Sequence, residues 1–200
     1  MSSAATVLRD RLNDSARIKA ELAADDESMA TLAAVAELMV RCLQGGGTVF
    51  FCGNGGSSTD ADHLSAELLG RFYRDRAALR SVSLSTNTAA MTAIGNDYGY
   101  DETFVRQLSG LSRPGDVLIG LSTSGNSANV VRAVEWAQGQ GVATVALTGR
   151  AGGKLAGLAD HVLQVPTDDT PRIQECHLNV GHTLCELVED RLFPAPGPTP

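Results

Sequence analysis

Five short apolar segments alternate with longer segments of helical periodicity along the chain of 200 residues, and this alternation is the strongest constraint on its fold. The apolar segments cover residues 48–52, 78–84, 117–121, 144–147 and 161–165. Parallel strands need a crossover, usually a helix, between one strand and the next, and they are commonly apolar throughout. The sequence therefore predicts an α/β fold, a three-layer sandwich with a mostly parallel central sheet.

Helices are expected at both ends of this alternating region. Apolar positions recur at helical spacing over residues 5–44, and the acidic stretch Asp25-Asp26-Glu27 divides them into two N-terminal helices. A long C-terminal helix should begin at Pro171 or Arg172, since proline is tolerated in a first turn, and should end near Leu192. The tail 193–200 contains four prolines and is expected to be disordered.

The composition argues against several classes of function. The formal charge is −7, and no dense stripe of lysine or arginine is present, so neither nucleic acid nor a membrane surface is an expected partner. No apolar run reaches about 18 residues, which predicts neither a membrane span nor a secretion signal. The two lysines, Lys19 and Lys154, lie outside the loops that follow strands, which disfavours Schiff-base chemistry.

The four cysteines show no metal-binding or redox spacing. None of them forms a CxxC pair, and two fall in helical segments; they are Cys42, Cys52, Cys176 and Cys185. We expect buried thiols in a reducing compartment, which indicates a cytoplasmic protein.

Small polar loops follow two of the predicted strands. Gly53–Ser58 follows the first strand, and Ser122–Ser127 follows the third. At the carboxyl ends of parallel strands, loop N–H groups and helix N-termini favour anions, so two such loops predict a phosphorylated ligand. The alternative is that glycine and serine serve only to permit positive φ and to cap helices. The first loop lacks the third glycine of a dinucleotide site, where Ser58 stands, and GxxxxGK[ST] is absent.

Two ionisable side chains follow the first loop at helical spacing. His63 and Glu67 lie about 400° apart around a helix, so they leave from the same face near its start. Imidazole and carboxylate groups so placed can form a general base or a metal site. The sequence therefore predicts reactive groups beside an anion-binding turn.

The other histidines are harder to rank. His161 stands at the start of a predicted strand and is interpreted as structural. The last helix carries four further N and O donors at helical spacings, which are Gln174, His177, His182 and Glu186. Gln174 and His182 are about 12 Å apart along the helix, and spacing alone does not select among these residues.

Several motifs together resemble the phosphoheptose isomerases of the sugar isomerase (SIS) superfamily, over about residues 45–192. The resemblance rests on Cys-Gly-Asn-Gly-Gly-Ser at 52–57, His63 with Glu67, Thr92–Tyr98, Ser122–Ser127 and Arg172-Ile173-Gln174-Glu175. It implies an SIS domain at 45–192 and N-terminal helices, 1–44, packed in an oligomer. It also implies a cytoplasmic homotetramer with active sites at subunit interfaces and one zinc ion per site.

The same resemblance implies roles for individual residues. The zinc ligands would be His63, Glu67, Gln174 and His182. The sugar would contact Asn54, Gly55, Gly56, Glu67, Asn96, Asp97 and Gln174, and the phosphate would contact Ser122, Thr123, Ser124 and Ser127.

The implied reaction converts sedoheptulose 7-phosphate to D-glycero-D-manno-heptose 7-phosphate through an enediol, as the first step of nucleotide-activated heptose biosynthesis. Glu67 would take the carbon-bound proton, and His182 would move protons on oxygen. The alternative is a non-catalytic SIS-domain scaffold or regulator of the kind that binds the replication initiator DnaA. Such relatives typically lack the glutamate that this chain has at Glu67.

Overall fold

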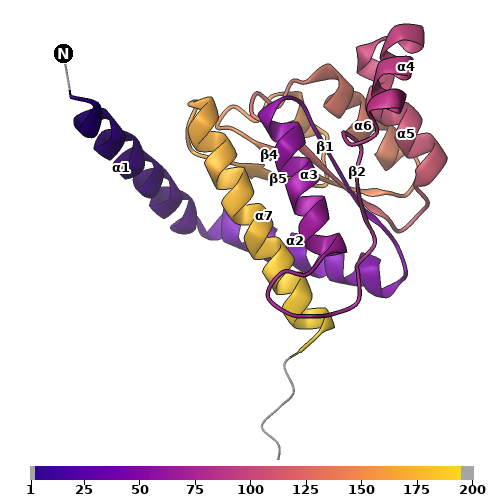
Figure 1. The fold of residues 1–200 in the computed structure, drawn as a ribbon, viewed down its shortest axis with the longest axis horizontal. Coiled ribbons are helices and arrows are strands. Elements are labelled where there is room, and N and C mark those ends of the chain that lie inside the picture. Colours follow the sequence, from indigo (N-terminus) through magenta and orange to yellow (C-terminus); the bar gives the residue numbers. More distant parts are fainter. Residues whose placement is uncertain (1–2, 195–200) are drawn as a thin grey trace, which may run out of the picture.

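The computed structural model describes residues 3–194 and contains a five-stranded sheet at its centre (Figure 1). The strands are β1 (Val49–Gly53), β2 (Ser81–Ser83), β3 (Val117–Ser122), β4 (Ala143–Thr148) and β5 (His161–Gln164), in the spatial order β2-β1-β3-β4-β5. All four pairings are parallel. The predicted α/β sandwich with a mostly parallel sheet is confirmed, and each predicted strand overlaps an observed one.

Helices cover both faces of the sheet. They are α1 (Ala4–Ala23), α2 (Asp26–Gln44), α3 (Gly56–Leu69), α4 (Thr88–Tyr98), α5 (Thr103–Leu111), α6 (Ala128–Gln138) and α7 (Thr170–Leu192), with short 3-10 turns η1 (Tyr100–Glu102) and η2 (Lys154–Gly157). Alternate strand residues point to opposite faces, so Phe51 and Ile119 pack with α2, α3 and α7, whereas Phe50 and Leu118 pack with α5 and α6. The result is the three-layer arrangement.

The helix boundaries follow local capping chemistry. The predicted break between the first two helices lies at Asp25, whose carboxylate caps α2 by accepting a hydrogen bond from the N–H of Glu27. Helix α7 begins at Thr170, with Pro171 in its first turn, and ends at Leu192, close to the predicted limits. The tail that the sequence predicts to be disordered comprises residues 193–200; Phe193 and Pro194 are described, and residues 195–200 lie outside the described part of the chain.

The N-terminal helices differ in how they meet the rest of the molecule. Helix α2 contributes Val35 and Met39, both fully buried, to the core beside the sheet. Helix α1 buries only Ile18 and Leu22 near its C-terminal end, and its N-terminal half projects from the body of the chain (Figure 1).

The strand connections predict where along the sheet a ligand would bind. The chain leaves β1 through α3, on one face, to reach β2, and leaves β3 through α6, on the other face, to reach β4. Loops that turn to opposite faces open a crevice at the carboxyl ends of adjacent strands. In this chain that position lies between β1 and β3, where both predicted anion-binding loops begin.

Candidate active site

The first loop turns sharply from β1 into α3. Gly55 has a φ of 56° and a ψ of −123°, a conformation for which glycine is suited, and α3 starts at the next residue. A Cβ at Gly53 would lie 2.6 Å from the carbonyl oxygen of Ser57, so this position also needs glycine. The glycines therefore allow the strand and the first turn of α3 to approach closely, with helix N–H groups at the crevice.

The second loop is held in shape by its own hydroxyl groups. Ser122 and Ser127 place their Oγ atoms 2.9 Å apart, and the N–H of Asn126 donates to the Oγ of Ser124 at 3.2 Å. Gly125 has a φ of 64° and packs so closely on Gly152 that a side chain there would overlap the backbone. A preformed loop of hydroxyl and N–H donors at the end of β3 suits a phosphate group.

A pair of side-chain amides joins the first loop to the start of α6, and sequence reasoning missed most of it. The side-chain amides of Asn54 and Asn129 exchange two hydrogen bonds, of 2.8 and 2.9 Å. The hydroxyl of Tyr100 also donates to Asn54 Oδ1, at 2.9 Å. Asn129 is 2% exposed, in the first turn of α6, so it ties the first loop to the helix that follows the second loop. No sequence signal indicates this pairing, because the partners are far apart along the chain.

The structure brings His63, Glu67 and His182 together. Their ligand atoms all lie within 4.8 Å of one another. The Nε2 atoms of His63 and His182 are 2.7 Å apart, and Glu67 Oε1 lies 3.2 Å from His63 Nε2. Two ring nitrogens that face each other can share one proton or bind one cation, and a carboxylate beside them completes a set of donors suited to a metal ion.

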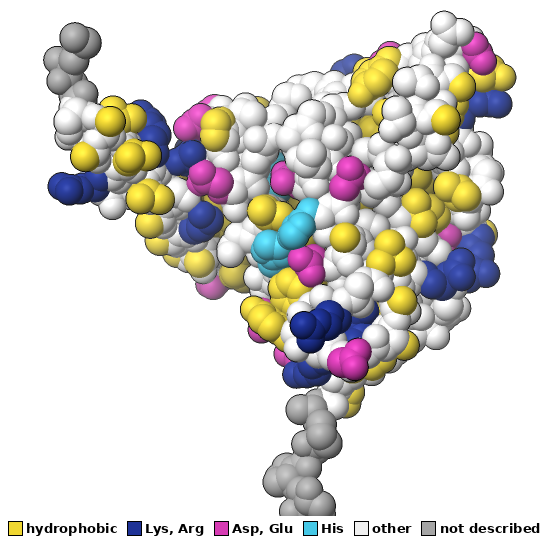
Figure 2. Space-filling view, in the orientation of Figure 1, with side chains coloured by type: hydrophobic (Ala, Val, Ile, Leu, Met, Phe, Trp, Pro, Cys, Tyr) yellow, Lys and Arg dark blue, Asp and Glu magenta, His cyan; other side chains and the backbone are white. Residues whose placement is uncertain are grey.

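Helices α3 and α7 supply this group because they run side by side. Gly181 allows a close contact there, since a Cβ at this position would come within 2.5 Å of the side chain of Leu64, which would have to move. His182 follows Gly181 directly and so faces the helix that carries His63. Figure 2 shows histidine side chains, in cyan, reaching the surface near the middle of this face, with acidic side chains close by.

Gln174 lies nearer the loops than the histidine group. Its side-chain amide covers Gly56, where a Cβ would overlap it. Since Gly56 and His63 are seven residues apart on α3, this contact is about 10 Å along the helix from His63. The structure thus places Gln174 at the start of α3, and its expected role as a metal ligand stays a prediction.

The remaining candidates on and near α7 occupy different environments. His177 is fully buried, and its Nε2 lies 3.1 Å from the carbonyl oxygen of Thr148. Burial lowers the pKa of His177 to about 4, which keeps the ring neutral at neutral pH. Glu186 is on α7 but is not a member of the group around His63, and His161 begins β5.

The expected sugar contacts on α4 are exposed. Asn96 and Asp97 are exposed on this helix, and the amide of Asn96 donates to Asp97 Oδ1 at 2.7 Å. Helix α4 packs against η1, whose Tyr100 reaches Asn54. Their contact with a sugar stays a prediction.

Asp60 is a further acidic group beside the site. Burial raises its pKa, while the nearby His63 acts in the opposite direction. Its Oδ2 is buried without a hydrogen-bond partner. Sequence reasoning passed over Asp60, although it lies one turn before His63 on the same helix.

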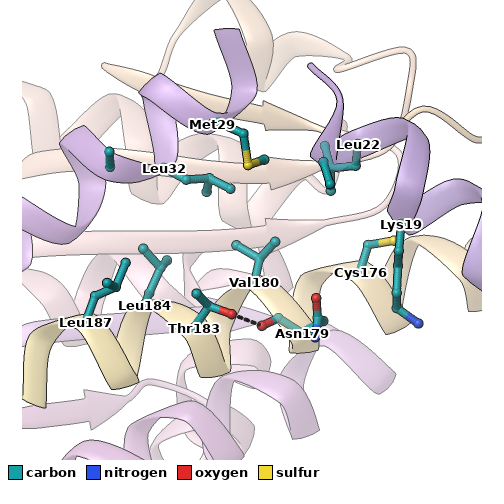
Figure 3. A pocket seen from close by; sticks show the side chains of 12 residues that line it. Lys19, Leu22, Met29, Leu32, Cys176, Asn179, Val180, Thr183, Leu184 and Leu187 are labelled. Carbon is teal, nitrogen blue, oxygen red and sulfur yellow. Dashed lines mark hydrogen bonds between the residues drawn. The ribbon is translucent and has the colours of Figure 1, made fainter. Parts of the chain in front are cut away.

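An apolar groove lies on the molecule away from these residues. It has a volume of about 250 Å³ and is lined by α1, α2 and α7 (Figure 3). Met29, Leu32, Val180 and Leu184 point into it from its two sides. None of the candidate site residues lines this groove, and its chemistry suits an apolar partner surface more than a sugar phosphate.

The cysteines and the hydropathy of the helices can be compared with what the composition predicts. The four cysteines are all buried and unpaired, as predicted. Over residues 3–194, no helix combines the length and the apolar character that crossing a membrane requires.

Comparison with known proteins places the chain in a family. The SIS domain family profile matches residues 13–149. Phosphoheptose isomerase from Rhodospirillum rubrum is 54% identical over 161 residues, which cover 80% of this chain and 86% of that protein. The enzyme of the same name from Aneurinibacillus thermoaerophilus is 44% identical over 186 residues, 93% of this chain and 94% of the relative.

A solved structure agrees with the sequence matches. The phosphoheptose isomerase of Neisseria gonorrhoeae superposes with a TM-score of 0.88 at 42% identity, over 94% of this chain and 100% of that one. The two loops at the carboxyl ends of β1 and β3, the facing histidines and this extent of similarity lead to the same conclusion: the chain belongs to the phosphoheptose isomerase family of SIS-domain proteins.

Proposed function

We propose that this protein is an aldose-ketose isomerase that converts sedoheptulose 7-phosphate to D-glycero-D-manno-heptose 7-phosphate, the first step of nucleotide-activated heptose biosynthesis. The observation that carries the proposal is the separation of two kinds of site along α3. The first of the two predicted anion-binding loops enters α3 at Gly56, and the histidine–glutamate group lies about 10 Å further along the helix. An open-chain sugar bound at the first loop could extend along α3, so that its C1–C2 end lies at the histidine–glutamate group while its phosphate lies at the second loop.

In this proposal the loops hold the phosphate and the chain of the sugar. Hydroxyl and N–H groups of Ser122, Thr123, Ser124 and Ser127 would bind the phosphate. Asn54, Gly55, Gly56, Asn96, Asp97 and Gln174 would contact the sugar, and the hydrogen bonds of Asn54 to Asn129 and Tyr100 support a fixed orientation of its amide.

The isomerisation needs two kinds of proton transfer. Glu67 removes a proton from C1 of the open-chain ketose and returns a proton to C2, so the carbon-bound hydrogen moves by one position. Through the ring nitrogen that does not face the metal site, His182 passes a proton to O2 as the enediol forms and accepts the O1 proton as the aldose carbonyl forms. Glu67 Oε1 faces His63 at 3.2 Å, which leaves Oε2 as the oxygen for the carbon-bound proton.

The donor set fits a divalent metal ion. Two imidazole nitrogens and one carboxylate oxygen converge in the structure, and these are ligand types that Zn²⁺ accepts. We propose that His63, Glu67 and His182 hold one zinc ion per site, with Gln174 as a further ligand. Bound zinc would supply Lewis acidity at the carbonyl and hydroxyl oxygens as negative charge develops on them.

We further propose a homotetramer with active sites at subunit interfaces, located in the cytoplasm. The projecting half of α1 supports assembly, because Leu8 and Leu12 are 66% and 71% exposed there. The groove between α1, α2 and α7 is a second apolar surface available for contact. The buried, unpaired cysteines support a reducing location.

Metal removal tests the proposed function. We expect the purified protein to form aldose phosphate from sedoheptulose 7-phosphate, to lose this activity on dialysis against a chelator, and to regain it with added Zn²⁺. Circular dichroism before and after dialysis would verify that the fold survives. Turnover that persists after complete metal removal, measured by elemental analysis, would contradict the metal site. Absence of turnover in the folded, zinc-loaded protein would favour the scaffold alternative.

A further inference from the structure

A buried ion pair lies at the C-terminal end of the two helices that carry the histidine–glutamate group. Arg76 Nε donates to Glu189 Oε1 at 3.0 Å, and both side chains are 2% exposed. The pair joins the segment that follows α3 to α7. Neither residue belongs to the catalytic, substrate or metal set proposed above.

Glu189 organises the segment after α3 through backbone hydrogen bonds. Its carboxylate accepts from the N–H groups of three consecutive residues, at distances of 2.8 to 3.2 Å: Phe72, Tyr73 and Arg74. A carboxylate with this many donors holds the backbone in one conformation, because each hydrogen bond fixes the position of one N–H group relative to Glu189.

Arg76 closes the end of α3. Its Nη2 donates to the carbonyl oxygen of Glu67 at 2.9 Å, and its Nη1 donates to the carbonyl oxygens of Leu68 and Gly70 at 2.7 and 2.8 Å. The last carbonyls of a helix lack partners within the helix, and a cation there is favourable. The same guanidinium therefore binds the backbone of Glu67, the residue proposed as the base.

The segment held by Glu189 also contacts the second catalytic group. The ring of Phe72 lies 5.8 Å from the ring of His182, centroid to centroid, with an angle of 35° between the planes. The N–H of Phe72 is one of the groups bound by Glu189. The position of the Phe72 ring beside His182 thus depends on the ion pair.

Stability alone gives little reason for such a pair. Burying two charges costs desolvation energy, and apolar residues of similar volume often stabilise a protein equally well or better. Fixed geometry is a different requirement, because an error of about 1 Å at a reacting group can lower a rate by about a hundredfold. The pair contacts both helices within about two turns of the place where His63 and His182 meet.

We propose that Arg76 and Glu189 are positioning residues for the isomerisation. Arg76 fixes the end of α3 that carries Glu67, and Glu189 fixes the segment that places Phe72 against His182. The inference rests on the proposed function for its kinetic consequences, while its geometric consequences can be measured without turnover.

The variant Glu189→Gln tests this role, with Val188→Ala as its matched control. Gln keeps the volume but removes the charge and turns an N–H donor toward the backbone N–H groups. We expect kcat to fall by at least about tenfold, with KM within about threefold of the wild type, since the phosphate loops are about 20 Å away at the other end of α3. Val188 is fully buried next to Glu189 on the same helix, so its truncation should lower stability and leave kcat unchanged.

A readout that does not depend on activity completes the test. We expect the nuclear Overhauser contact between the rings of Phe72 and His182 in the metal-free protein to persist in Val188→Ala and to weaken in Glu189→Gln. Affinity for Co²⁺, measured by titration, should fall at least about tenfold in Glu189→Gln alone. If Glu189→Gln does not fold, Arg76→Lys serves instead, because lysine keeps the charge but cannot reach several carbonyls at once.

The outcomes separate the two proposals. The inference would be overturned if Glu189→Gln lost as much stability as Val188→Ala but kept the wild-type kcat, ring contact and Co²⁺ affinity. The pair would then be purely structural. A wild-type protein without isomerase turnover, in which the ring contact and Co²⁺ affinity still respond to Glu189→Gln, would overturn the proposed function and leave the positioning role intact.

Discussion

At the scale of single residues, the proposed chemistry depends on side chains whose positions are fixed by their neighbours. His63 and His182 face each other at 2.7 Å although 119 positions separate them in the chain. Glu67, one turn from His63, is partly shielded, with 22% of its side chain exposed. Its proposed role as the base that takes the carbon-bound proton is the basis of the first prediction.

Glu67→Gln should lower kcat by about 10² or more, because the amide keeps the size and a hydrogen-bonding oxygen but cannot accept the carbon-bound proton. The measurement is steady-state turnover of sedoheptulose 7-phosphate. Glu186→Gln, which alters a glutamate of α7 outside the histidine group, is the control and should retain activity. Wild-type turnover in Glu67→Gln would remove Glu67 from the role of base.

The double variant Ser122→Ala, Ser124→Ala should raise KM much more than it lowers kcat. Phosphate contacts far from C1 and C2 contribute mainly to binding in both ground and transition states. Ser109→Ala, at an exposed serine of α5 away from the loops, is the control. A large fall in kcat with unchanged KM would show that the loop acts on the reacting carbons and not on the phosphate.

The residue scale also shows where prediction from the sequence stops. The pair of His63 and Glu67 follows from helical spacing, since both lie on one helix. The selection of His182 over His177 and Glu186 does not follow from spacing, because it depends on which side of α7 meets α3. Leu64 of α3 packs against Gly181, and this contact turns that side of α7 toward α3. Asn129 and Tyr100 could not be found for the same reason, as their contacts with Asn54 are purely tertiary.

At the scale of secondary-structure elements, the sequence predicts more of the structure than it does for contacts between single residues. All five strands and the break between α1 and α2 were predictable, since hydrophobic periodicity, apolar runs and capping residues are local properties of the sequence. Strand β2 is shorter than the predicted segment 78–84, because pairing with β1 covers only Ser81–Ser83. The side-by-side packing of α3 and α7 involves an ion pair that no local pattern indicates, and this pair carries the next prediction.

Stability should depend on pH through Glu189. Burial acts to raise its pKa, but hydrogen bonds from the N–H groups of Tyr73, Phe72 and Arg74 and from Arg76 outweigh it and lower the pKa below the usual 4.5. Because the native pKa is depressed, the ionised group stabilises the fold above the unfolded-state pKa, and this contribution is lost as the pH falls through the native pKa.

Denaturant unfolding of the wild type and of Glu189→Gln between pH 3 and 8 measures this pH dependence of stability. We expect a difference of about 3 kcal/mol in the free energy of unfolding at neutral pH, from the loss of one partner of a buried pair. The difference should be constant above about pH 5.5 and should shrink below about pH 4.5. A difference that does not vary with pH would show that ionised Glu189 adds no stability.

At the scale of the whole molecule, apolar surface remains uncovered in the single chain. The projecting half of α1 exposes Val7, Leu8 and Leu12, and the nearby groove exposes part of Met29 and Leu187 (Figures 1 and 3). Uncovered apolar surface of this kind is typical of interaction surfaces, and the proposed tetramer would cover it.

Leu8→Glu with Leu12→Glu should shift the protein from a tetramer to smaller species, because burying two carboxylates at an apolar contact is unfavourable. Light scattering coupled to size-exclusion chromatography measures the mass. Arg9→Glu is the control, since it changes the net charge by the same amount on the same exposed stretch of helix. A double variant that stays tetrameric would show that this part of α1 lies outside the interfaces.

The most direct test of the central claim is proton NMR of the zinc-loaded protein acting on sedoheptulose 7-phosphate in deuterated buffer. Transfer through an enediol, with Glu67 exchanging its proton with solvent, predicts heptose 7-phosphate that carries solvent deuterium at C2. Aldose formed without deuterium at C2 would contradict a solvent-exchanging base, and a folded, zinc-loaded protein that forms no aldose would contradict the isomerase function itself.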